Sequence, residues 1–255
     1  MALIVKKFGG SSVATTEKIM NIAKRVLGEK KPDDKIVLVV SAMGDTTDDL
    51  IELAQGINKN PYQFTREMDM LLTTGEQQSA SLMAMAFKTL GQDAVSLTGP
   101  MAGVKTNDVY TKGRIKDIKP ERVHQELDAG KIVVITGFQG ANDLGDYVTL
   151  GRGGSDTSAV AIAGALQADS CEIFTDVDGV YSADPRIVPG ARKMNEITYH
   201  EMLEMARLGA GVMQPRSVEM GEYFHIPIHV RSTFTTDTGT FIREDYTMED
   251  KDFVI

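Results

Sequence analysis

The chain has 255 residues, of which 42% are hydrophobic and 25% charged, and its formal net charge is −9 at neutral pH. These fractions are typical of folded globular proteins, and the length allows one large α/β domain or two smaller ones. The negative charge argues against a general nucleic-acid binder, which needs a basic surface to displace counterions. The longest apolar runs, residues 36–40 and 132–135, have the length of core strands and are too short to span a membrane, so we expect no membrane partner.

Cysteine usage and the N-terminus favour a cytoplasmic protein. Cys171 is the only cysteine, which excludes an intrachain disulfide and a cysteine metal cluster. It lies in the apolar stretch 171–174, so we expect it to be inert core packing rather than a reactive thiol. The N-terminus has no basic region before its first apolar run and no cleavage site, and it predicts a first strand rather than a signal peptide.

Apolar runs of strand length alternate with helical periodicity along the chain. In chain order, we expect a strand at 2–5, a helix at 16–27, a strand at 36–40, a helix at 76–90, a strand at 94–97, a helix at 121–129, a strand at 132–135, a helix at 156–168, a strand at 170–174, helices at 199–208 and 217–224, and strands at 228–230 and 240–242. This order predicts an α/β fold of βαβ units, with helices on both faces of a mostly parallel sheet. Ligands should then bind beyond the carboxyl ends of the strands.

The composition changes after residue 242. Residues 243–252 are strongly charged and are followed by three apolar residues, Phe253, Val254 and Ile255. We interpret 243–255 as a linker and the start of another strand, with the chain stopping just inside a missing domain. A frayed terminus that docks locally is an equal alternative.

The segment KKFGGSS, residues 6–12, follows the first predicted strand and precedes the first predicted helix. Glycines there allow close approach of the backbone to a ligand, and a helix N-terminus offers unpaired N–H groups to a phosphate. A lysine beside the turn supplies a positive charge for phosphoryl oxygens. An ordinary turn with a solvated lysine explains this segment equally well when it is taken alone.

The segment GRGGSD, residues 151–156, carries a stronger signal. Asp156 or Ser155 could be only an N-cap of the following helix. A cap needs one such residue, however, and not three glycines and an arginine. Because an arginine can bind a carboxylate or a phosphate with two hydrogen bonds, the segment predicts an anion-binding loop.

The segment TDVDGVY, residues 175–181, follows the strand at 170–174 and precedes DPR at 184–186. Its beginning suggests calcium, but glycine is at the fourth position of the loop rather than the sixth, and Ile187 is where an EF-hand has glutamate. Calcium is therefore excluded. A nucleotide site would use Asp176 on hydroxyls or ring nitrogens, Tyr181 as a packing face and Arg186 on phosphate.

Two more polar segments follow this pattern: SAMGDTT (41–47) comes after a strand, and TTGE (73–76) is expected to open a helix. Both suit a small polar substrate, although ordinary capping explains each one separately. Other nucleotide-binding templates fail, because the chain has no GxxxxGK[ST] and no HRD or DFG, and residue 156 is aspartate where GxGxxG needs glycine. The four histidines have no metal-ligand spacing.

Taken together, KFGG, SAMG, TGE, GRGGSD and TDVDGVY…DPR resemble the aspartokinase family of the amino-acid kinase superfamily, collinearly from about residue 2 to about 242. The resemblance implies a three-layer αβα sandwich around a central, mainly parallel sheet of roughly eight strands. Residues 1–242 would be the catalytic domain, with an N-terminal substrate lobe and a C-terminal nucleotide lobe. Residues 243–255 would lead to a missing regulatory ACT domain, so the feedback-inhibitor site would be absent.

The resemblance also implies a reaction, in which L-aspartate and MgATP give 4-phospho-L-aspartate and ADP. This reaction begins the biosynthesis of lysine, threonine, methionine and diaminopimelate. ATP and Mg²⁺ would be the cofactors, and the enzyme would be a homodimer.

Roles for individual residues follow from the resemblance as well. Lys7 and Asp156 would be catalytic, with Lys7 neutralising the transferring phosphoryl group and Asp156 orienting Lys7 or the metal. Aspartate would be bound by Ser41, Thr47, Glu76, Arg152, Gly153, Gly154 and Ser155. ATP would be bound by Lys7, Phe8, Gly9, Gly10, Ser41, Ser155, Thr175, Asp176, Tyr181 and Arg186. The metal ligands stay open.

One departure from the family pattern affects the nucleotide site. Gly211 and Gln214 stand where many relatives have lysine and histidine, so no nucleotide-contacting lysine is expected there. The alternatives are a related kinase acting on glutamate, N-acetylglutamate or a nucleoside monophosphate such as UMP, or a non-catalytic amino-acid or nucleotide sensor on the same fold. A Rossmann oxidoreductase is disfavoured by the missing glycine fingerprint.

Overall fold

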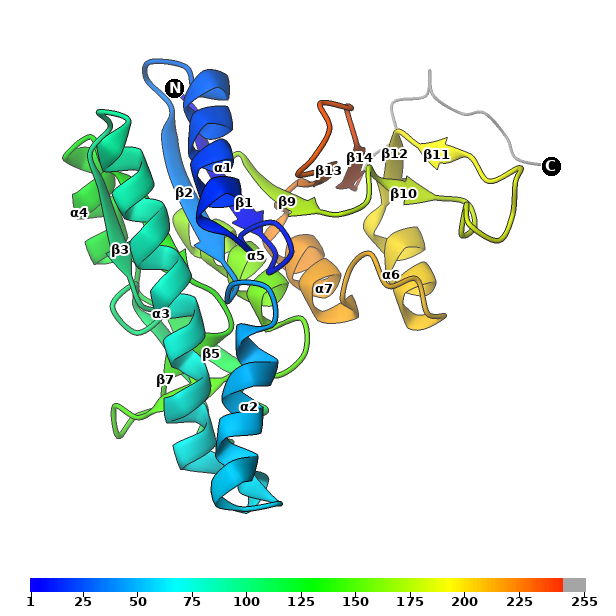
Figure 1. Cartoon of the computed structure of the whole chain (residues 1–255). Helices are drawn as coiled ribbons and strands as arrows, with labels where there is room; N and C mark the ends of the chain where they lie inside the picture. The colour runs from blue at the N-terminus through cyan, green and yellow to red at the C-terminus, as the bar shows by residue number, and fades with distance from the viewer. Residues whose placement is uncertain (245–255) are drawn as a thin grey trace.

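A computed structural model describes residues 1–244 of the chain (Figure 1). At its centre is an eight-stranded sheet in the order β12-β14-β13-β9-β1-β2-β6-β3. All neighbouring strands pair in parallel except β13 and β14, which are antiparallel. The strands are β1 (Leu3–Phe8), β2 (Lys35–Val40), β3 (Ala94–Leu97), β6 (Ile132–Thr136), β9 (Ser170–Thr175), β12 (Glu196–Thr198), β13 (Ile228–Ser232) and β14 (Thr240–Arg243).

Strand β2 shows why the sheet is covered on both faces. Its apolar residues 36–40 are all buried, and they alternate between two separate cores. Val37 and Val39 lie in the core shared with four helices, α4 (Glu121–Asp128), α5 (Gly154–Leu166), α6 (Tyr199–Arg207) and α7 (Pro215–Phe224). Leu38 and its neighbours lie in the core under α1 (Thr16–Glu29) and α3 (Thr65–Thr89). The predicted three-layer αβα sandwich is confirmed, because a strand covered on both faces must be apolar on both.

Several shorter elements were not predicted. A second sheet contains β4 (Val104–Thr106), β5 (Ile115–Ile118), β7 (Gln139–Ala141) and β8 (Tyr147–Thr149), in the order β5-β4-β7-β8. Strands β10 (Val180–Tyr181) and β11 (Lys193–Met194) form a hairpin, and α2 (Thr46–Ile57) and the 3₁₀ turn η1 (Pro61–Gln63) lie between β2 and α3. Strands of two to four residues are too short to show a reliable periodicity.

The predicted beginning of α3 is wrong. The segment TTGE was expected to open this helix, but α3 begins at Thr65 and residues 73–76 lie inside it. Glycine in this segment has a packing role, since a Cβ on Gly75 would lie 2.9 Å from the Cβ of Ala42. The glycine therefore lets α3 approach the loop after β2 closely, and it is not a helix-start signal.

The single cysteine and the C-terminal segment were also the subject of predictions. Cys171 is fully buried in β9, as predicted, and its burial raises the pKa of the thiol. The predicted linker at 243–255 lies, apart from its first two residues, outside the described residues. Within residues 1–244, no helix has both the length and the apolar character needed to cross a membrane.

Candidate active site

A buried ion pair joins the first strand to the helix that follows GRGGSD. The Nζ atom of Lys7 lies 2.6 Å from Oδ1 of Asp156, and the two side chains are 11% and 13% exposed. Residues alternate along β1, so Lys7 points to the same face as Val5, which is the face covered by α5. Asp156 lies in the first turn of α5, where the helix dipole favours a carboxylate. The structure therefore brings both predicted catalytic residues together.

The glycines after β1 make room around this pair. A Cβ on Gly9 would lie 3.4 Å from Nζ of Lys7, and a Cβ on Gly10 would lie 3.0 Å from the carbonyl oxygen of Ala42. The loop thus packs against the end of β2 and leaves the lysine ammonium uncovered on the glycine side. Phe8 is fully buried and stacks on Phe174 at 4.5 Å between ring centroids, so its side chain faces the core.

Glu76 is the second unusual charged group. It is 3% exposed; its Oε1 accepts a hydrogen bond of 3.2 Å from the backbone N–H of Ala42, and its Oε2 has no hydrogen-bond donor among residues 1–244. Burial raises the pKa of Glu76 to about 7. A buried carboxylate oxygen without a partner is costly, and a bound cation would remove that cost.

Contacts connect Glu76 to the glycine loop and to Ser41. Ala42 hydrogen-bonds Glu76 and packs against Gly10, so it lies between the two. The hydroxyl of Ser79, one turn along α3 from Glu76, donates to the carbonyl oxygen of Ser41 at 2.6 Å. The ends of β1 and β2 and the middle of α3 therefore form one continuous surface. Thr47 lies in the first turn of α2 and is partly exposed.

The loop before α5 depends on its glycines. Gly151 and Gly153 have φ values of +75° and +67°, a region that side chains disfavour. A Cβ on Gly153 would lie 2.0 Å from the Cγ atom of Gln214, and a Cβ on Gly154 would lie 2.8 Å from the Phe138 ring. Arg152 is exposed, and within the described part of the chain its guanidinium has no hydrogen-bond or ion-pair partner. The loop thus presents the guanidinium of Arg152 to the solvent.

Phe138 was not among the residues predicted from the sequence. It has φ +68°, which is rare for a large side chain and indicates a backbone held by its surroundings. Its N–H donates to Oγ of Ser158 at 3.1 Å, and its carbonyl oxygen accepts from the N–H of Leu150 at 2.9 Å. Phe138 therefore ties the end of β6 to both ends of the GRGGSD loop. The signal in the sequence was an aromatic residue that directly follows Gly137, three residues after the strand predicted at 132–135.

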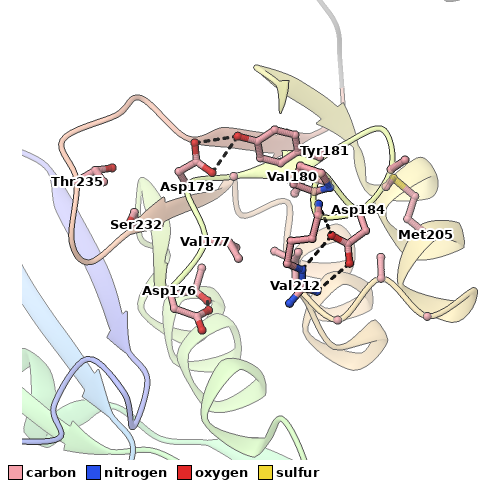
Figure 2. Close-up of a pocket in the computed structure, with 18 of the residues that line it drawn as sticks. Asp176, Val177, Asp178, Val180, Tyr181, Asp184, Met205, Val212, Ser232 and Thr235 are labelled. Carbon is pink, nitrogen blue, oxygen red and sulfur yellow. Dashed lines mark hydrogen bonds and ion pairs between the residues drawn. The ribbon is translucent and has the colours of Figure 1, made fainter. Parts of the chain in front are cut away.

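A pocket of about 1060 Å³ opens at the carboxyl ends of β9 and β13 (Figure 2). Four of the residues predicted to bind the nucleotide line it, namely Thr175, Asp176, Tyr181 and Arg186. The other six, Lys7, Phe8, Gly9, Gly10, Ser41 and Ser155, are not part of its lining.

All four predicted residues that line the pocket have partners in it, and the Thr175 hydroxyl donates to Oδ1 of Asp176 at 3.1 Å. The Tyr181 hydroxyl donates to both carboxylate oxygens of Asp178, at 3.1 and 3.0 Å, and these bonds raise the pKa of Tyr181. The Arg186 guanidinium makes two hydrogen bonds to Asp184, at 3.0 and 2.8 Å, which lower the pKa of Asp184 to about 2. Asp178 and Asp184 were not among the predicted site residues.

Two further segments complete the pocket. Residues 209–212, where the sequence departs from the family pattern at Gly211, line one side together with Met205 and Leu208 of the preceding helical region. Ser232, Phe234 and Thr235 line another side and were not predicted. The signal for the second segment was available, because it is a polar run directly after the strand predicted at 228–230.

The fold and the geometry of this site agree with the comparisons with known proteins. Residues 2–232 match the model of the amino acid kinase family, and the chain belongs to this family. It is 53% identical to the aspartokinase of Bacillus sp. (strain MGA3) over 249 residues, which cover 98% of this chain and 60% of that protein. The crystal structure of aspartate kinase from Synechocystis is 47% identical with a TM-score of 0.84, and the match covers 97% of this chain and 40% of that one.

A more distant structure was determined with ligands. E. coli aspartokinase III in complex with aspartate and ADP is 26% identical with a TM-score of 0.85, and the match covers 96% of this chain and 65% of that one. The match to the Bacillus relative shows that this chain spans about 60% of the length of that protein.

Proposed function

We propose that this chain is the catalytic part of an aspartate kinase. It would transfer the γ-phosphoryl group of ATP to the side-chain carboxylate of L-aspartate, giving 4-phospho-L-aspartate and ADP. The observation that carries the proposal is the buried Lys7–Asp156 pair beside a glycine loop that Ala42 links to a buried carboxylate, Glu76, whose Oε2 has no partner within residues 1–244. The choice of aspartate is supported by 53% identity to an aspartokinase over almost the whole chain.

Phosphoryl transfer to a carboxylate needs positioning and neutralisation of charge more than it needs a general base. The aspartate side chain has a pKa near 4, so it is already an anion and a nucleophile at neutral pH. Its oxygen would attack the γ-phosphorus in line, the bond from phosphorus to the β–γ bridging oxygen would break, and ADP would leave. Lys7 would stabilise the charge on the phosphoryl oxygens, with Asp156 holding its ammonium in place.

The amino-acid substrate would be bound through its own charges. Glu76 would take the ammonium group, which supplies the cation that its Oε2 lacks. Arg152, the cation of the GRGGSD loop, would bind the α-carboxylate with two hydrogen bonds. Ser41, Thr47, Gly153, Gly154 and Ser155 would complete this pocket.

The nucleotide would lie in the pocket at the ends of β9 and β13, with its phosphates toward the glycine loop. Thr175, Asp176, Tyr181 and Arg186 would contact it, as would Gly9, Gly10 and the backbone of Phe8. Arg186 is 87% exposed and already paired with Asp184, so a phosphate would share its guanidinium.

Mg²⁺ fits this arrangement as a companion of the nucleotide. Within residues 1–244, no three His, Cys, Asp or Glu side chains gather into a metal-binding group. Mg²⁺ often keeps several waters and binds through one or two carboxylates plus substrate phosphates, so Asp156 would be the protein carboxylate that helps to hold it. When bound, the ion would neutralise charge on the phosphates.

The alternatives are a kinase of the same family that acts on glutamate, N-acetylglutamate or UMP, and a non-catalytic sensor of amino acids or nucleotides. The presence of both Lys7 and Asp156 in a buried pair favours an enzyme over a sensor. A homodimer in the cytoplasm is a further part of the proposal, and it is supported by the resemblance and by the sequence features described first.

The decisive experiment measures ADP release from MgATP with aspartate, glutamate, N-acetylglutamate and UMP as separate acceptors. Aspartate should stimulate ADP release far more than the other three, and 4-phospho-L-aspartate should be trapped by hydroxylamine as the hydroxamate. A reaction without acceptor measures background hydrolysis. Stronger stimulation by another acceptor would replace aspartate, and ADP binding without stimulation by any acceptor would favour the sensor.

A further inference from the structure

One wall of the nucleotide pocket is hydrogen-bonded to residues outside the pocket lining, on the first helix and in the turn beside Lys7. Residues 232–235, here called the wall loop, begin at the last residue of β13 and contribute Ser232, Phe234 and Thr235 to the pocket lining. Figure 2 shows Ser232 and Thr235 on one side of the pocket, across from Asp184 and Met205 on the other. The position of this loop sets the width of the space that a nucleotide would occupy.

Arg25 of α1 holds the wall loop by its backbone. Nη1 of Arg25 donates to the carbonyl oxygens of Ser232 and Thr233, both at 2.9 Å. The Arg25 side chain is only 17% exposed, and its guanidinium carbon lies 4.8 Å from the centroid of the Phe174 ring. Its Nε donates to Oε1 of Glu29 at 3.0 Å. The guanidinium is therefore fixed on several sides, and it in turn fixes two consecutive carbonyl groups of the loop.

The carboxylate that orients Arg25 stays ionised. Burial alone would raise the pKa of Glu29, but the charges of Lys6 and Arg231 and the hydrogen bond from Arg25 lower it to about 2. Glu29 lies 3.1 Å from Lys6 and 3.1 Å from Arg231. The network thus connects Arg25, through Glu29, to Lys6 of β1 and Arg231 of β13.

A second link joins the wall loop directly to the glycine loop. The hydroxyl oxygens of Ser12 and Thr233 lie 2.6 Å apart, and Ser12 is fully buried. The N–H of Ser12 donates to the carbonyl oxygen of Gly9 at 3.0 Å, so Ser12 is part of the turn beside Lys7. The N–H of Thr233 donates to the carbonyl oxygen of Thr175 at 2.9 Å, which continues the pairing of β13 with the neighbouring strand β9. Thr233 therefore connects the glycine loop with the end of β9, where Thr175 also lines the pocket.

We propose that Arg25 and the Ser12–Thr233 hydrogen bond are positioning elements for the nucleotide. They hold the wall loop in register with the glycine loop, so that a nucleotide in the pocket presents its phosphates to Lys7. Small displacements of a reacting group cost large factors in rate, and the nucleotide pocket and the Lys7 loop belong to different elements that need such a connection. The inference rests on the proposed function in one respect, which is that the pocket binds ATP and ADP.

The test is a double-mutant cycle on Ser12→Ala and Thr233→Val, with ADP binding measured by calorimetry and KM measured for ATP and for aspartate. Removing a hydrogen bond between two neutral groups weakens binding by about 3- to 10-fold when the bond matters for it. We expect each single variant to raise the Kd of ADP and the KM of ATP by such a factor. The Kd of ADP in the double variant should be no higher than in the more impaired single variant, because both substitutions remove the same bond. The KM of aspartate should change less than about twofold.

Arg25→Lys tests the second element, because one ammonium cannot hold two carbonyl groups and pair with Glu29 in the same geometry. We expect an increase of about 10-fold or more in the Kd of ADP. Lys35→Ala is the control, since it removes the ion pair of Lys35 with Asp128, whose side chain is 66% exposed. It should leave ADP binding unchanged.

Several outcomes would overturn the inference. The first is a Kd of ADP within twofold of wild type in all three single variants. The second is that the effects of Ser12→Ala and Thr233→Val on the Kd of ADP multiply fully in the double variant. The third is an increase in the KM of aspartate as large as that in the KM of ATP. Wild-type protein that binds ADP but shows no aspartate-dependent turnover would refute the proposed function, while the calorimetric cycle would still decide this inference.

Discussion

The ammonium of Lys7 and the carboxylate of Asp156 lie 2.6 Å apart in a nearly dry environment, although one belongs to the first strand and the other to a helix in the second half of the chain. A buried ion pair is often no more stabilising than a well-packed apolar pair. Its presence at the end of a strand, beside a glycine loop, therefore indicates a functional role more than a structural one.

The first prediction separates these two roles. Lys7→Met and Asp156→Asn should each lower aspartate-dependent turnover by about 100-fold or more, because each removes charge at the transferring group. Each should also lower the free energy of unfolding, by as much as about 3–5 kcal/mol, since one charge stays buried without a partner. The double variant should recover part of that stability and stay inactive. Urea unfolding and ADP release measure both effects, and a double variant with near-normal turnover would contradict the assigned roles.

The second prediction concerns the affinity for aspartate as a function of pH. Burial raises the pKa of Glu76 to about 7, so its carboxylate is largely protonated below that pH in the free enzyme. A neutral carboxyl group cannot pair with the substrate ammonium, and we expect the KM of aspartate to increase as the pH falls from 8 to 6. In Glu76→Gln the KM should be high and nearly independent of pH over this range. A wild-type KM that stays constant between pH 6 and 8 would argue against this role for Glu76.

The third prediction concerns stability without substrate and does not depend on the proposed reaction. The pKa of Glu76 is about 7 in the folded chain, whereas an ordinary glutamate side chain has a pKa of 4.5. Between these values the folded protein keeps a proton that the unfolded chain has lost, so the free energy of unfolding falls as the pH rises. A tenfold difference in proton affinity corresponds to about 1.4 kcal/mol, so the total loss of stability is on the order of a few kcal/mol.

Urea unfolding of ligand-free protein at pH 5 and pH 8 tests this. The loss of stability between the two pH values should be smaller in Glu76→Gln than in wild type. Glu126→Gln is the matched control, because the hydrogen bond from Lys131 lowers the pKa of Glu126, so this carboxylate is ionised in both the folded and the unfolded chain over this pH range and its removal should leave the pH dependence unchanged. An equal pH dependence in wild type and Glu76→Gln would contradict the prediction.

The fourth prediction concerns the backbone of the GRGGSD loop. Gly153 has φ +67°, and an added Cβ would meet Gln214 at 2.0 Å. Gly153→Ala should therefore reduce turnover by at least about 10-fold, since it displaces the loop that carries Arg152. Adding Gln214→Gly removes the colliding Cβ, Cγ and Cδ atoms but not the cost of the positive φ, which is on the order of 1 kcal/mol. Partial recovery in the double variant is expected. No recovery would mean that φ alone, and not the contact with Gln214, requires glycine there.

Local pattern in the sequence predicted the alternation of strands and helices, a mostly parallel sheet with helices on both faces, and the loops in which the site was expected. It could do so because apolar periodicity, β-branched runs and glycine-rich turns are local properties of the chain. The motifs GRGGSD and TDVDGVY are local patterns of the same kind. The residues of TDVDGVY that were predicted to bind the nucleotide, Thr175, Asp176 and Tyr181, line one pocket.

Only the tertiary structure decided which of these residues meet. Sequence spacing does not show that Asp156 pairs with Lys7, that Glu76 lies in the middle of a helix with a bare carboxylate oxygen, or that Arg25 reaches the wall loop. It also led to the wrong start for α3, because the role of Gly75 depends on how closely the helix approaches Ala42. Burial, the pKa of a carboxyl group and contacts between distant segments arise from packing across the sheet, and local pattern carries no information about them.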